Sequence, residues 1–182
     1  MLRFLISLVA DSFAFLLILR FILQIYKADY NHPLILLLVR ATNPILSIAR
    51  MVLPNKMKYD YACILAALCL FLIKYTLILL LIFKIISPLS LFLYIGLDTL
   101  KAVLNVYVYA LIIYAITSWM RGNNRQQTFE NYRSPYSLVL LIANSCLSKI
   151  KPLRFKNFDL RVLILVFVGF MLINICNNFI LI

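Results

Sequence analysis

Charged side chains within long apolar stretches are the residues of this sequence with the clearest capacity for chemistry. Asp98 and Lys101 lie three positions apart and Asn105 follows four positions later, so on a helix all three share one face. Asp11 and Lys74 lie within two other apolar stretches. A charge near the centre of a bilayer costs at least ~2.5 kcal/mol on insertion scales, so such residues usually pair or face a polar interior. These residues predict an intramembrane polar core.

Two explanations of this core remain open from the sequence. One is a polar path, or a centre sensitive to protons or ions. The other is a set of ion pairs that neutralise one another and hold helices together. Pairing meets the energetic demand without any transport, so it is the simpler explanation.

A second pattern combines basic and apolar residues. Arg40, Asn43, Ser47 and Arg50 recur at steps of three, four and three among Leu, Ile, Val and Ala, which predicts a helix with a narrow cationic face. Such a helix lies at a membrane surface or docks into a helical bundle. Pro44 lies inside it and is expected to kink it.

The same spacing returns later, in Asn144, Ser148 and Lys151. We expect basic residues on the two helices to contact anionic lipid head groups, or a membrane or cytoplasmic protein partner, at about 1 kcal/mol for each residue near the surface. The alternative is that they only fix the orientation of the loops. The residues concerned are Arg40, Arg50, Lys149 and Lys151.

Composition sets the class of protein. The chain has 182 residues, of which 65% are apolar and 13% charged, whereas a soluble domain carries about a quarter charged residues. Its mean hydropathy is +1.00. Stretches of about twenty apolar residues are long enough to cross a bilayer, and each is expected to be a helix. The sequence thus predicts an all-α membrane protein with four transmembrane helices, at Phe4 to Tyr26, Tyr61 to Ile86, Leu91 to Met120 and Leu160 to Ile182.

The basic residues also predict an orientation. Lys and Arg concentrate in the segments 27–60 and 121–159, which four crossings place on one side of the membrane. The positive-inside rule assigns that side to the cytoplasm. The expected location is a bacterial inner membrane, with multiple passes and cytoplasmic basic loops. Because the basic residues flank apolar spans, nucleic acid is not an expected partner despite the net charge of +12.

The order of features repeats. Residues 1–86 and 87–182 each contain a span, a basic amphipathic helix and a span, so two parallel repeats are expected. Parallel repeats occur in some transporters, although inverted ones are commoner.

The chain resembles the YggT family of small bacterial and plastid membrane proteins over nearly its whole length. In the first half the resemblance rests on Arg20, Thr42-Asn43-Pro44-Ile45-Leu46, Arg50, Leu53-Pro54 and Tyr59-Asp60. Asn144 and Asp159 occupy the matching places of the second half, and Lys74, Lys101 and Ser118-Trp119 extend the match. The chain departs from the family pattern at Met57 and Ser47-Ile48, and it lacks a proline after Asn144.

The resemblance implies a role in tolerance of osmotic or ionic stress. Two alternatives are also implied: a scaffold for envelope or cell-division proteins, and a membrane factor for cofactor assembly. We expect no enzymatic activity, because no GxSxG, HExxH or phosphate-binding glycine loop is present. No cofactor or metal is expected either, since His32 is the sole histidine.

Overall fold

The computed structural model describes residues 1–52, 60–82, 87–120, 135–148, 154–155 and 158–180. Helices account for nearly all of them. In chain order these are α1 (Leu2–Ile25), α2 (Pro33–Val52), α3 (Ala62–Ile82), α4 (Pro88–Met120), α5 (Pro135–Leu147) and α6 (Leu160–Ile180). Two strands of two residues each, β1 (Arg154–Phe155) and β2 (Phe158–Asp159), pair antiparallel before α6.

Among the described residues, five helices are long and apolar enough to cross a membrane, one more than the sequence predicted. Four of them, α1, α3, α4 and α6, correspond to the expected spans with ends that differ by a few residues. The fifth is α2, which was expected to lie along the surface. Large apolar side chains are exposed over all of these helices, as suits a protein surrounded by lipid. The helices therefore indicate a multi-pass membrane protein.

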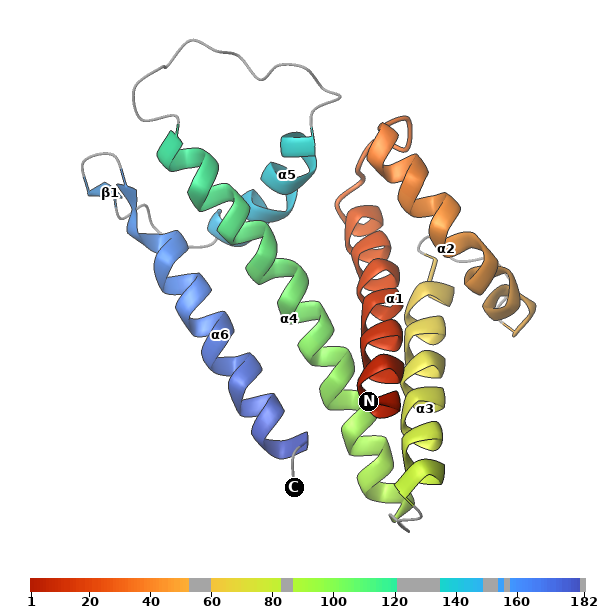
Figure 1. Ribbon diagram of the computed structural model, residues 1–182. Coiled ribbons are helices and arrows are strands. Elements are labelled where there is room, and N and C mark those ends of the chain that lie inside the picture. The colour runs from red at the N-terminus through yellow and green to blue at the C-terminus, as the bar shows by residue number, and fades with distance from the viewer. Residues whose placement is uncertain (53–59, 83–86, 121–134, 149–153, 156–157, 181–182) are drawn as a thin grey trace.

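Figure 1 shows the arrangement of the helices. The start of α1, the end of α3, the start of α4 and the end of α6 lie at one end, and these four helices run away from it. The inclined helices α2 and α5 lie toward the other end. The closest pairs are α1 with α3 and α4 with α6, while α1 and α3 also pack against α4. The division into repeats at 1–86 and 87–182 stays a prediction.

Small side chains explain the close packing of α1 on α3. Ala14 on α1 and Ala67 on α3 are fully buried, and Ala66 is nearly so. In a membrane, where lipid tails are as apolar as leucine, helices associate through van der Waals packing that small residues permit. The close packing of α1 on α3 brings the polar side chains of the two helices within reach of one another.

The start of α2 follows from local hydrogen bonds. The backbone N–H of Asn31 donates to Asp29 Oδ1 at 3.0 Å, and that of Leu34 donates to His32 Nδ1 at 3.2 Å. Pro33 takes the first helical position, where a missing N–H has no consequence. The helix continues on both sides of Pro44, and the kink expected there stays a prediction.

Helix α5 ends at Leu147, and the backbone N–H of Ser148 still donates to the Asn144 carbonyl at 2.8 Å. The second amphipathic pattern, drawn from Asn144 through Lys151, stays a prediction. The guanidinium of Arg161 donates to the Leu147 carbonyl at 3.3 Å and so satisfies one of the free carbonyls at the end of α5. Lys149 and Lys151 lie outside the described residues.

Candidate functional site

A buried lysine lies at the centre of the charged residues that the sequence singled out. Lys74 on α3 places its Nζ 2.8 Å from Asp11 Oδ1 on α1 and 2.6 Å from Asp98 Oδ2 on α4. Its side chain is 7% exposed and that of Asp98 is 3% exposed. Three helices are thus joined by one ammonium group.

Further contacts complete the network. Lys101 donates to Asp98 Oδ1 at 3.4 Å, and the hydroxyl of Tyr75 donates to Asp98 Oδ2 at 2.8 Å. The Lys74 ammonium also lies 5.3 Å from the centroid of the Phe71 ring, within the range of a cation–π interaction. Tyr75 and Phe71 were not predicted, although both stand within one turn of Lys74 in an expected span.

The charges of this network balance, with two lysines against two aspartates. Balance and hydrogen bonding offset part of the cost of removing the charges from water. Exposure is uneven, however, because the Asp11 side chain is 43% exposed and that of Lys101 is 26% exposed. A sealed pair, Lys74 and Asp98, is therefore flanked by two accessible charged groups.

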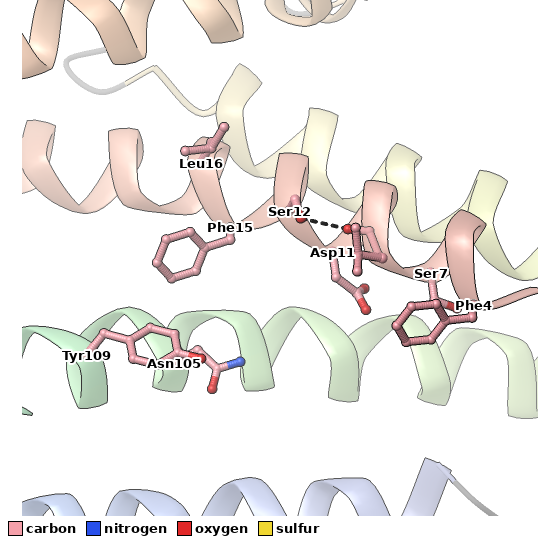
Figure 2. A pocket seen from close by; sticks show the side chains of 9 residues that line it. Phe4, Ser7, Asp11, Ser12, Phe15, Leu16, Asn105 and Tyr109 are labelled. Carbon is pink, nitrogen blue, oxygen red and sulfur yellow. Dashed lines mark hydrogen bonds between the residues drawn. The ribbon is translucent and has the colours of Figure 1, made fainter.

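Asp11 opens into a cavity of about 550 Å³ between α1 and α4. Figure 2 shows Asp11 pointing from α1 toward α4, which presents Asn105 and Tyr109 to the same space. The structure thus places Asn105 beside Asp11 in this cavity, and no hydrogen bond joins it to Asp98 or Lys101. Ser7 and Ser12 add hydroxyl groups to the wall.

A second cluster of polar side chains, Arg20, Thr42 and Asn43, joins the end of α1 to α2. Arg20 is 8% exposed, and its Nη1 donates to Thr42 Oγ1 at 2.6 Å and to Asn43 Oδ1 at 3.0 Å. Thr42 is fully buried and donates in turn to the Leu38 carbonyl. The family residues Arg20 and Asn43 are thus in contact, and Thr42 accepts a hydrogen bond from the same nitrogen of Arg20.

The remaining residues of the motif connect α2 with α3. Arg50 forms a salt bridge with Asp60, whose backbone N–H donates to Gln24 Oε1 at 3.2 Å. Within the described part of the chain, the buried atoms Arg50 Nε and Asp60 Oδ1 have no hydrogen-bond partner. Gln24 was not predicted. Nearby, burial raises the pKa of Tyr30 in the turn before α2, and the Arg20 guanidinium opposes part of that rise.

The other predicted residues have varied positions. Leu46 is fully buried on α2, where it belongs to the core, and Pro44 is exposed. Asn144 is exposed on α5, and Asp159 belongs to β2. Pro54 lies outside the described residues. Arg40 is exposed, whereas Arg50 forms a salt bridge with Asp60, and a lipid contact of either residue stays a prediction. Among the residues described, no three His, Cys, Asp or Glu side chains gather as metal ligands would.

The fold and its ionic network define the class: a multi-pass α-helical membrane protein with charged side chains paired inside the membrane. A model of the CCB3/YggT family matches residues 1–81. This match over the first part of the chain, with the similarity to a protein named YggT, confirms the resemblance found in the sequence.

Several curated proteins are similar to this chain in sequence. An uncharacterized protein in the proC 3′ region of Vibrio alginolyticus is 34% identical over 119 residues, or 64% of this chain and 64% of that protein. An uncharacterized protein of Pseudomonas aeruginosa is 32% identical over 130 residues, or 64% and 60%. The chain thus spans less than two thirds of these two relatives. The uncharacterized protein YggT of Escherichia coli is 29% identical over 154 residues, or 84% and 75%. No solved structure matches the chain.

Proposed function

We propose that the protein supports osmotic or ionic balance at a bacterial inner membrane, without enzymatic activity, through the polar core of Asp11, Lys74, Asp98 and Lys101. The observation that carries this proposal is that the buried Lys74 ammonium bridges two carboxylates, of which Asp98 is sealed and Asp11 opens into a cavity. Asp11 has one oxygen bound to Lys74, and its other oxygen is available to a proton or cation from that cavity.

The expected chemistry is an exchange of partners. When a proton or cation neutralises Asp11, Lys74 keeps Asp98 as its counter-ion, and the network gains a net positive charge. A net charge in a low-dielectric site changes the interaction between α1, α3 and α4, because unpaired buried charges are costly. The core would thus sense or conduct ions through Asp11.

Neutral variants of the exposed charges test this function. We expect Asp11→Asn and Lys101→Leu to lower survival after salt shock, and to reduce cation flux into liposomes holding the purified protein by about tenfold, the factor for one charge-assisted hydrogen bond. Thr76→Val is the matched control, because Thr76 lies on the same helix as Lys74, is exposed and bonds only carbonyls of its own helix among described residues. Normal flux and survival in both variants, with normal membrane insertion, would remove the proposal.

The proposed topology has four crossings, with α2 and α5 as interfacial helices of two parallel repeats. Support comes from the exposure of Arg40 and Ser47 on α2, and from the inclination of α2 and α5 at one end (Figure 1). Anionic lipid is the proposed partner of Arg40. Maleimide labelling of an Arg40→Cys variant should therefore succeed in inverted vesicles and fail in intact cells. Labelling in intact cells would place α2 on the outer side and refute this topology.

A scaffold for envelope or division proteins is the second candidate. The observation that favours it is the exposed surface of α2, which includes Leu37, Ile48 and Met51 as well as Arg40. Arg40→Glu is the discriminating variant, because Arg50→Glu would also break the salt bridge to Asp60. A scaffold predicts that Arg40→Glu disturbs septum placement while Lys101→Leu is tolerated.

A further inference from the structure

Polar groups without partners line the cavity beside Asp11. The second carboxylate oxygen of Asp11, the Asn105 amide and the hydroxyls of Ser7 and Tyr109 form no hydrogen bond with any residue that the structure describes. Within a bilayer such groups are costly unless they are satisfied. A polar group bound in this cavity would therefore satisfy them.

An apolar groove continues from the same cavity. It has a volume of about 440 Å³, and it shares Phe15, Leu16 and Tyr109 with the polar cavity. Along α1 it extends from Phe15 to Leu23, about 12 Å at 1.5 Å per residue. Side chains of α2, α4 and α5 form its other walls, among them Leu37, Ala41, Ala110, Ile113 and Ile142.

We infer that the two spaces together bind one amphiphile: a long-chain lipid with a small uncharged hydroxyl head, the head at Asp11 and Asn105 and the chain along the groove. A hydroxyl suits both partners, because it donates to the carboxylate oxygen and accepts from the amide. The inference does not depend on the proposed role in ion balance.

Depth in the membrane selects the head group. Asp11 lies nine residues after the start of α1, about 13 Å along it, whereas the hydrocarbon layer is about 30 Å thick. The head would thus lie near the middle of the hydrocarbon layer. Moving the charged head of a phospholipid to this depth would cost far more free energy of hydration than moving a hydroxyl there. The charged head therefore stays at the interface.

Photolabelling tests the inference. The purified full chain is reconstituted in phosphatidylcholine liposomes with hexadecanol that carries a diazirine in its chain, and labelled positions are mapped by peptide mass spectrometry. We expect labels on groove residues of α1, α2 and α4. Asn105→Leu should lower labelling about fivefold, as for the loss of one hydrogen bond, and Ala41→Phe should lower it by filling the groove at an exposed position.

The control is Val168→Phe on α6, which is exposed and lines neither space, so labelling should not change. If Ala41→Phe fails to fold, Ala41→Leu replaces it. Equal labelling of wild type and all variants would show ordinary surrounding lipid, and absent labelling would show that water fills the cavity. Equal labelling of the groove by a photoreactive phosphatidylcholine would assign the groove to a diacyl lipid. Each of these three results would overturn the inference.

Discussion

Replacing Lys74 with Leu is expected to destabilise the protein by about 3–5 kcal/mol, the usual cost of removing one partner of a buried ion pair. The reason is that Asp98, only 3% exposed on its side chain, would keep Lys101 at 3.4 Å and lose its 2.6 Å contact with Lys74. Asp11 would lose its salt bridge at the same time. Unfolding of the purified protein in mixed micelles, with SDS as denaturant, gives the free energy directly.

A double variant separates charge from packing. In Lys74→Leu with Asp98→Asn, no buried carboxylate remains uncompensated, and the asparagine oxygen still accepts from the Tyr75 hydroxyl. We therefore expect the second substitution to restore a large part of the lost stability, which is a coupling that only interacting residues show. If the two losses simply add, the charges do not interact and the network is not the main link between α1, α3 and α4.

The second large effect concerns Arg20→Leu, which is expected to cost about 2–3 kcal/mol, in the range of hydrogen bonds to a charged group. Leucine fills similar space but cannot donate to Thr42 or Asn43, so α2 loses its polar attachment to the end of α1. Thr42 keeps its bond to the Leu38 carbonyl, which limits the damage on α2 itself. The same SDS titration measures the change, and limited proteolysis reports whether α2 has detached.

Arg40→Leu is the matched control for this variant, since Arg40 is an exposed arginine of α2 and its loss should change stability by less than about 0.5 kcal/mol. Arg20→Lys should have an intermediate effect, because an ammonium is a point charge without the planar fork of donors. Equal stability of Arg20→Leu and Arg40→Leu would mean that the Arg20 contacts do not hold α2.

The polar core could be predicted because placing a charged side chain in lipid costs much free energy unless the charge is paired. Asp11, Lys74, Asp98 and Lys101 were recognisable as partners from their apolar surroundings, and the structure brings them together. Asn105, grouped with them by its spacing, lies on the same helix as Asp98 and Lys101 and lines the cavity beside Asp11. Its membership of the polar core stays a prediction. Tyr75 and Gln24 are ordinary residue types in apolar segments, and only tertiary packing reveals what they contact.

The amphipathic helices show the other limit of sequence patterns. The spacing predicted one polar face on α2, but Thr42 is buried and Asn43 accepts a hydrogen bond from Arg20 of α1, while Arg40 and Ser47 are exposed. The helix is also long and apolar enough to be a candidate span. In the second half the predicted pattern ran through Lys151, whereas α5 ends at Leu147 and Lys151 lies outside the described residues. Periodicity describes which residues would share a face, and it carries little information about where a helix stops.

The salt bridge between Lys74 and Asp98 has a consequence for how the protein can be divided. Lys74 lies within residues 1–81, the segment that matches the family model, and its most buried counter-ion comes from α4, beyond that segment. In a fragment made of those residues alone, Lys74 would keep the half-exposed Asp11 as a counter-ion and would lose Asp98. We expect such a fragment to insert poorly or self-associate, and co-production of residues 87–182 to rescue it by complementation.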